Sequence, residues 1–173
     1  MIDLSKKVIA FVDHEFEDLE HWYPVYRLRE AGCQVDIVGP EAGVTYKGLY
    51  GTAAKSDFAY GDVNAADYDA IVVPGGWAPD KIRRYPEALD IVKKLDEADK
   101  PIGHICHAGW VLVSADVLKG HNVTSTVAIK DDMVNAGATW VDEPVVVCGN
   151  IVSSRRPSDL PDYMREYVKL LGL

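Results

Sequence analysis

The most informative part of the chain is the stretch Gly103-His104-Ile105-Cys106-His107-Ala108-Gly109-Trp110. It joins a short apolar segment, residues 101–105, to a segment at 107–114 whose apolar residues recur at helical spacing. This order predicts a strand, a sharp turn at Cys106 and a helix. A residue at such a turn projects its side chain into the cleft at the end of the sheet.

The same alternation of strand and helix runs through the rest of the chain. Short apolar runs bounded by turn residues predict further strands at 7–12, 35–38, 68–73, 122–126, 139–141, 145–148 and 151–153. Helical spacing predicts helices at 17–31, 86–98 and 159–171, with a kink at Pro24, and the glycines from Gly43 to Gly51 predict short hairpin strands. Together these patterns predict one α/β domain over residues 1–173, a three-layer sandwich with a mainly parallel central sheet.

Composition and charge narrow the class of protein. A hydrophobic content of 48% with 26% charged residues is typical of globular proteins and not of disordered or fibrous ones. The net charge of −9 repels nucleic acid and anionic membranes, so neither is expected as a partner. Residues 1–7 lack the apolar segment of a secretory signal, and three cysteines without a CxxC pair favour free thiols, so a cytoplasmic location is expected.

Cys106 is the candidate nucleophile. The helix that begins after it would direct partial positive charge and free N–H groups at the sulfur, which predicts a lowered thiol pKa. The N–H of His107 and one from Gly75 or Gly76 would form an oxyanion hole, because loops after neighbouring parallel strands meet at one edge of the sheet. Composition alone favours the alternative, a buried core thiol.

Five sequence blocks resemble the ThiJ/PfpI family, which includes intracellular proteases and stress proteins. The blocks are Glu15-Phe16-Glu17-Asp18, Pro74-Gly75-Gly76, Ile105-Cys106-His107, Lys130-Asp131-Asp132-Met133-Val134-Asn135-Ala136-Gly137 and Ser153-Ser154-Arg155-Arg156-Pro157-Ser158-Asp159-Leu160. Their order and spacing cover nearly the whole chain. The resemblance implies a flavodoxin-like fold of the class I glutamine amidotransferase type.

The resemblance also implies roles for individual residues. It makes Cys106 the nucleophile and Glu17 the carboxyl group that hydrogen-bonds its sulfur, protonated if it is buried beside a thiolate. Without the resemblance, Glu17 is interpreted as a carboxylate at the start of a helix. His107 would act as a general base or orient the substrate. Asp80 from a neighbouring subunit would complete the site in a homodimer or homohexamer, and a helix cap before Lys81 is the alternative.

Two departures from the family pattern lie beside Cys106. His104 stands where many relatives have a small residue, and Ala108-Gly109-Trp110 stands where they usually have Gly-Pro-Gln. Strand alternation places His104 on the side of Cys106, where it would carry protons or occupy substrate space, whereas Trp110 is interpreted as a core residue. Neither a second half of a metal site nor a nucleotide-binding glycine loop is recognisable, so no metal and no cofactor are expected.

The favoured hypothesis is a cofactor-independent cysteine enzyme in which a Cys106 thiolate attacks a reactive carbonyl. The resemblance implies glyoxalase III or protein deglycase chemistry that converts methylglyoxal to lactate, or alternatively an intracellular cysteine peptidase acting on peptides. Because Trp110 and His104 narrow the space, aldehyde chemistry ranks first. A different class, a stress or chaperone protein that senses redox state, would oxidise Cys106 to a sulfinic acid held by Glu17. Arg155 and Arg156 are interpreted as surface residues.

Overall fold

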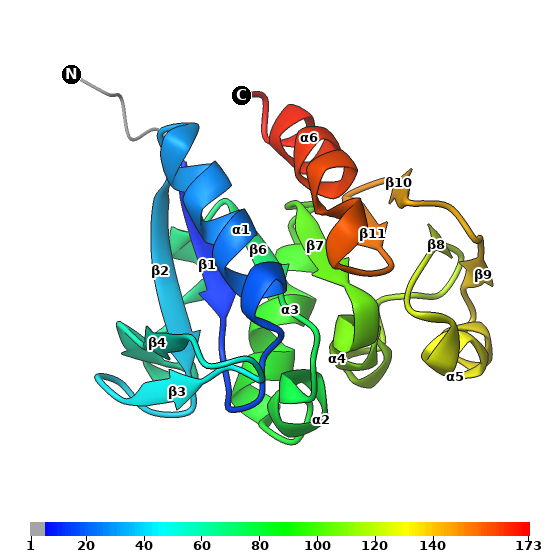
Figure 1. Cartoon of the computed structure of the whole chain (residues 1–173). Coiled ribbons are helices and arrows are strands. Elements are labelled where there is room, and N and C mark those ends of the chain that lie inside the picture. The colour runs from blue at the N-terminus through cyan, green and yellow to red at the C-terminus, as the bar shows by residue number, and fades with distance from the viewer. Residues whose placement is uncertain (1–5) are drawn as a thin grey trace.

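The computed structural model describes residues 6–173 and is built around a seven-stranded sheet. The strands of this sheet are β1 (Lys7–Phe11), β2 (Gln34–Gly39), β5 (Phe58–Ala59), β6 (Ala70–Val73), β7 (Ile102–Ile105), β10 (Val145–Cys148) and β11 (Ile151–Ser154). Their order is β10-β11-β7-β6-β1-β2-β5 (Figure 1). Strands β10 and β11 are antiparallel, and the other neighbouring pairs are parallel. The predicted mainly parallel sheet is confirmed.

Helices cover both faces of the sheet (Figure 1). The main ones are α1 (Asp18–Glu30), α3 (Pro86–Glu97), α4 (Gly109–Ala115) and α6 (Leu160–Leu170). Side chains alternate along each strand and so supply two cores. In β1, Val8 and Ala10 pack with residues of α1 and α6, whereas Ile9 and Phe11 pack with residues of α3 and α4. The predicted three-layer sandwich is therefore confirmed.

Smaller elements lie around this framework. They are the antiparallel pair β3 (Thr45–Lys47) and β4 (Ala53–Lys55), the parallel pair β8 (Asn122–Val123) and β9 (Thr139–Trp140), α2 (Ala78–Ile82), α5 (Lys130–Asn135), and 3-10 helices at Tyr60–Asp62, Ala65–Asp67, Cys106–Ala108, Val127–Ile129 and Pro157–Asp159. The predicted hairpin is thus confirmed as β3 and β4. The strands predicted at 122–126 and 139–141 are shorter and lie outside the central sheet.

Helix α1 continues through Pro24, which is buried inside it. A proline removes one backbone hydrogen bond, and the packing of α1 on the sheet is sufficient to keep the helix continuous. Residues 1–5, part of the stretch from which the absence of a secretory signal was inferred, lie outside the described residues. Among residues 6–173, every helix is too short or too polar to span a bilayer.

Candidate active site around Cys106

Cys106 directly follows the last residue of β7. Its backbone has a φ of 60°, in the left-handed region that costs a non-glycine residue roughly 1–2 kcal/mol. A 3-10 helix at Cys106–Ala108 then leads into α4. The strand, sharp turn and helix predicted from the sequence are confirmed. Such strain is typical of residues that the fold holds in a functional position.

The Cys106 side chain lines a cleft with a volume of about 290 Å³. The apolar part of the wall comes from Leu49, Tyr50, Trp77 and Pro157. Carboxyl groups, Cys106 and the His107 ring supply the polar part. The combination of an apolar wall with a few convergent polar groups is typical of a small-molecule site.

Two loops are joined to each other beside this cleft. The loop after β1 forms an isolated bridge to the turn after β6, between Phe16 and Gly76. The N–H of Glu17 donates to the carbonyl oxygen of Gly75 at 3.2 Å, and the N–H of Trp77 donates to that of Glu15 at 2.8 Å. These bonds fix the first turn of α1 against the sheet edge where Cys106 lies.

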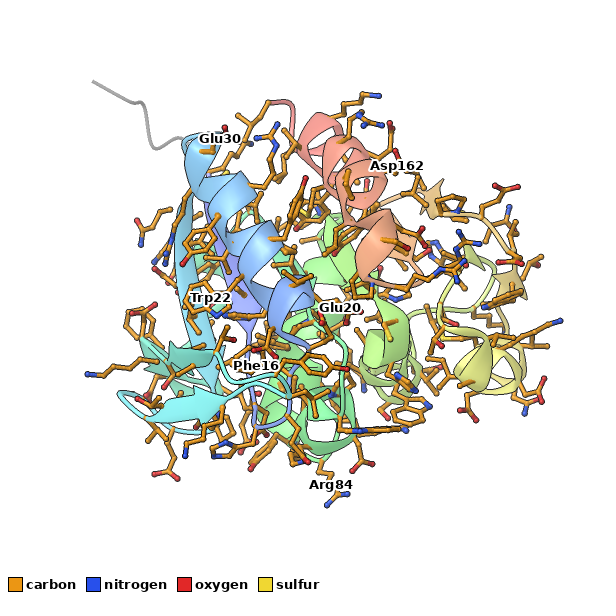
Figure 2. All side chains as sticks on the ribbon, in the orientation of Figure 1. Phe16, Glu20, Trp22, Glu30, Arg84 and Asp162 are labelled. Carbon is orange, nitrogen blue, oxygen red and sulfur yellow. The ribbon has the colours of Figure 1, made fainter. Side chains whose placement is uncertain are left out.

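The carboxyl group that reaches the Cys106 thiol belongs to Glu20, in the first turn of α1 (Figure 2). Glu20 is only 2% exposed. Its Oε2 accepts a hydrogen bond from the Gly75 N–H at 2.8 Å, and its Oε1 has no other partner among the described residues. Burial, and then the charge of Glu17, raise the pKa of Glu20 to about 8. At neutral pH the carboxyl group is therefore mostly protonated and can donate from Oε1 to the sulfur.

Glu17 has a different position from the one predicted. Its Oε2 accepts from the Glu20 N–H at 2.8 Å, so Glu17 is the N-cap of α1. The prediction that Glu17 hydrogen-bonds the sulfur is wrong, and its interpretation as a helix-start carboxylate is confirmed. The extended backbone of an N-cap residue turns its side chain toward the N–H groups of the first turn. The side chain that reaches the sheet edge is that of Glu20, three residues later.

The protonation of Cys106 also differs from the prediction. Burial, and then the neighbouring Glu20 carboxylate, raise the pKa of the Cys106 thiol to about 12, although the N–H groups of His107 and Gly76 act in the opposite direction. The predicted lowering of the thiol pKa by the helix is therefore wrong for the free protein. Because the thiol and Glu20 are in contact, their titrations are coupled, and the pair loses its first proton near pH 8.

The His107 ring lies beside the sulfur. Its Nδ1 is 3.3 Å from Sγ of Cys106. Burial lowers the pKa of His107, so the imidazole is neutral at pH 7 and Nδ1 can accept the thiol proton while Nε2 carries a hydrogen. The geometry that a general base requires is present.

Gly75 and Gly76, the two candidate oxyanion donors in the turn after β6, direct their N–H groups at different partners. The Gly76 N–H is directed at Cys106 together with the N–H of His107. The N–H of Gly75 already donates to Glu20. Gly76 therefore remains the candidate oxyanion donor, and Gly75 holds the Glu20 carboxyl group in place.

His104 lies away from the cleft. It is fully buried in β7, level with Val73 of β6 and Ser153 of β11. The neighbouring Gly103 packs against Tyr163 of α6, so alternation directs His104 to the opposite face of the sheet, toward α3 and α4. The expectation that His104 shares the side of Cys106 is wrong, because the left-handed turn at Cys106 ends the strand alternation.

Burial of His104 predicts acid sensitivity. Neither ring nitrogen has a hydrogen-bond partner within residues 6–173, and burial lowers the pKa of His104 to about 3. The unfolded chain takes up a proton near the ordinary pKa of about 6.5, so stability is lost as the pH falls below that value. Urea denaturation at pH 7 and at pH 5 measures how far the unfolding free energy falls between these two pH values. We expect this fall to be about 2 kcal/mol smaller in His104→Leu than in the wild type. Equal losses would contradict the assignment, and exposed His14→Ala is the control.

The remaining predicted residues lie at the margin of the site. Asp80 lies in the first turn of α2 and forms an ion pair with Arg84, which follows this helix. Because the N-cap of α2 is Trp77, the alternative interpretation of Asp80 as a helix cap is wrong. The predicted contribution of Asp80 to a neighbouring subunit stays a prediction. Arg155 forms ion pairs with two aspartates and is 17% exposed, whereas the side chain of Arg156 is 62% exposed. The surface interpretation therefore holds for Arg156 only.

Sequence reasoning missed five residues that line the cleft: Glu20, Leu49, Tyr50, Trp77 and Pro157. The spacing of Glu17 and Glu20 was an available signal, because residues three apart on a helix lie on neighbouring faces and only one of them can cap it. Trp77 gave no signal, since it follows the turn after β6 at the N-cap of a five-residue helix.

Comparisons with known proteins agree with this fold. The model of the DJ-1/PfpI family matches residues 6–170. Deglycase PfpI from Pyrococcus furiosus is 47% identical over 95% of this chain and 99% of its own length. A Bacillus subtilis protein named "Putative cysteine protease YraA" is 42% identical over 97% of this chain and 99% of its own length.

Solved structures show the same architecture. Drosophila melanogaster DJ-1beta superimposes with a TM-score of 0.89 at 26% identity, covering 98% of this chain and 92% of its own. A two-domain protein from Anabaena variabilis with a DJ-1/ThiJ/PfpI-like and a ferritin-like domain has a TM-score of 0.95 at 37% identity over 97% of this chain. This chain spans about half, 48%, of that two-domain protein. The chain belongs to the DJ-1/PfpI family, whose flavodoxin-like fold it has.

Proposed function

We propose that this protein is a cofactor-independent cysteine enzyme that converts small reactive carbonyl compounds, with methylglyoxal and its amine adducts as substrates and lactate as the product. The observation that carries the proposal is the convergence on Sγ of Cys106 of the Glu20 carboxyl group and the Nδ1 atom of His107. Relatives named deglycase, at 47% and 48% identity, support the same chemistry.

In the first step the Cys106 sulfur adds to the aldehyde carbon of methylglyoxal. The carbon–sulfur bond forms, the thiol proton passes to Nδ1 of His107, and the carbonyl oxygen becomes an alkoxide. The N–H groups of Gly76 and His107, which are directed at Cys106, would donate to that oxygen until the His107 imidazolium protonates it. The product of the step is a hemithioacetal on Cys106.

In the second step a proton moves between the two substrate carbons. A Glu20 carboxylate takes the proton from the carbon bound to sulfur and returns it to the neighbouring carbon, while the hydroxyl proton moves to the ketone oxygen, so the hemithioacetal becomes a lactoyl thioester. Water then hydrolyses the thioester, releases lactate and returns the proton to the thiol. The balance is one methylglyoxal and one water for one lactate and one proton. An amine adduct gives the same thioester, with the free amine as its leaving group.

The size of the cleft favours small substrates over peptides. Its volume of about 290 Å³ lies at the lower limit of ligand pockets, about 300–1,000 Å³. The name of the YraA relative supports a peptidase as the second candidate. A redox sensor is disfavoured because sensor cysteines have a low pKa, whereas burial raises the pKa of Cys106.

The test is the production of lactate from methylglyoxal by the wild type and by Cys106→Ala, with Cys33→Ala as the control. Cys33 is a buried cysteine outside the cleft, so its variant is expected to retain activity. We expect Cys106→Ala to make no lactate above the uncatalysed rate. Cleavage of a fluorogenic peptide without lactate production would replace the proposal by the peptidase, and equal lactate from wild type and Cys106→Ala would refute the nucleophile.

A further inference from the structure

The His107 ring packs against two tryptophans, Trp77 and Trp110. Its centroid is 4.9 Å from that of Trp77 and 5.1 Å from that of Trp110, with interplanar angles of 44° and 54°. The two indoles therefore restrict rotation of the imidazole. Because the neighbouring residue is Cys106, a fixed ring keeps Nδ1 directed at Sγ, 3.3 Å away.

Trp110 is itself held from outside the cleft. Its Nε1–H donates to Oδ2 of Asp132 in α5 at 2.7 Å. On its ring lies the guanidinium group of Arg83, 5.6 Å from the ring centroid, and Nε of Arg83 donates to Ser114 at 2.9 Å. These contacts form a continuous chain from the surface of α5 to the imidazole.

Trp77 differs from Trp110 in exposure. Trp77 is 48% exposed and also forms part of the cleft wall, whereas Trp110 packs against the core on the α3 and α4 face. Trp110 is therefore the fixed side of the pair. The sequence interpretation of Trp110 as a core residue accounts for its packing but not for its contact with His107.

We propose that Trp110, anchored by Asp132, is a positioning residue that holds the His107 ring so that Nδ1 accepts the Cys106 proton. Trp77 packs against the same ring. This inference rests on the proposed role of Cys106 as the reacting group. It assigns a function to Asp132, a surface residue that touches neither the thiol nor the cleft.

The experiment measures the rate of Cys106 alkylation by iodoacetamide as a function of pH, by the mass of the Cys106 peptide. In this reaction the sulfur–carbon bond forms, iodide leaves and the thiol proton passes to His107, so no turnover is needed. The variants are Trp110→Leu, Trp110→Phe and Asp132→Ala. The controls are Asp131→Ala, an exposed neighbour of the same charge on α5, and Trp22→Leu, a partly buried tryptophan of α1.

Trp110→Leu is expected to lower the alkylation rate at pH 7 by roughly 10- to 100-fold, because a misplaced base loses that much efficiency. A freed imidazole is better solvated, so its pKa rises toward the ordinary value and the acid limb of the profile moves to higher pH. Asp132→Ala is expected to move the limb in the same direction, and Trp110→Phe to recover part of the rate. If Trp110 had only a structural role, its replacement would not shift the acid limb of the alkylation profile.

Unchanged profiles in both folded variants, Trp110→Leu and Asp132→Ala, would overturn the inference, as would equal shifts in Asp131→Ala. Because alkylation does not require a substrate, the effect on Cys106 can be present even if the wild type makes no lactate. In that case the proposed substrate fails and the positioning role stands. Cys148, a free cysteine that is partly exposed, provides an internal reference thiol in every sample.

Discussion

Replacing Glu20 by glutamine is expected to lower the rate of lactate formation at pH 7.5 by about 10²-fold or more, the usual contribution of a positioned proton carrier. Glutamine keeps the oxygen that accepts from Gly75 but cannot take a proton from carbon. The pH profile should change as well. In the wild type, activity is expected to rise as the pH increases through about 8, because burial raises the pKa of Glu20 to that value. In Glu20→Gln that rise is expected to disappear.

Glu17→Gln is the matched control, because it changes a carboxyl group three residues away in the same helix. Its amide oxygen can still accept from the Glu20 N–H, so α1 keeps its cap. The charge of Glu17 contributes to the raised pKa of Glu20. We therefore expect the activity of Glu17→Gln to remain within a few-fold of the wild type and its pH midpoint to move below 8. A greater loss in Glu17→Gln than in Glu20→Gln would reverse the assignment of the two carboxyl groups.

Gly76→Ala is expected to lower the unfolding free energy by about 3 kcal/mol or more and to abolish activity. Gly76 has a φ of 72°, and a Cβ there would lie 2.5 Å from the backbone N of Glu17 and still closer to the backbone O of Glu15. Backbone atoms cannot rotate away, so the bridge between the loops after β1 and β6 would have to open. Urea denaturation and the rate of lactate formation from methylglyoxal measure the two effects.

Gly43→Ala separates the cost of backbone strain from the cost of the clash. Gly43 has a φ of 74°, close to that of Gly76, but a Cβ there meets nothing within 4 Å. Its substitution should cost only the strain, about 1 kcal/mol, with activity retained. Similar losses in the two variants would show that contact between the loops contributes little.

The central sheet was predictable from sequence because each buried strand is a short apolar run, and α3 and α6 were predictable because each has one apolar face. Helix α1 was predicted in the right place although it has no such face, since Glu20 and His21 are buried in it while Leu19 and Tyr26 are exposed. The smaller elements were not. In α5 the residues from Lys130 to Asn135 are mostly polar, and β8 and β9 have two residues each, too few for a periodic pattern. Tertiary contacts, and not local periodicity, hold these segments in place.

The candidate site was predictable as far as Cys106 and His107, whose position between strand and helix directs them to the sheet edge. Which of Glu17 and Glu20 reaches the thiol depended on the cap geometry of α1, and the face of His104 depended on where the strand alternation stops. The thiol pKa depended on burial in the assembled cleft, which outweighs the N–H groups of the turn. Cap geometry, the end point of strand alternation and burial in the cleft are properties of the folded structure, and the pattern of residue types along the sequence does not specify them.

The most direct test of the central claim is the mass of the Cys106 peptide after turnover with methylglyoxal is stopped in acid, which preserves thioesters. The proposed reaction predicts one lactoyl group on Cys106 in the wild type, and none on Cys33 or Cys148. Formation of lactate with the Cys106 peptide unmodified throughout, and with undiminished lactate in Cys106→Ala, would contradict a covalent role for this cysteine.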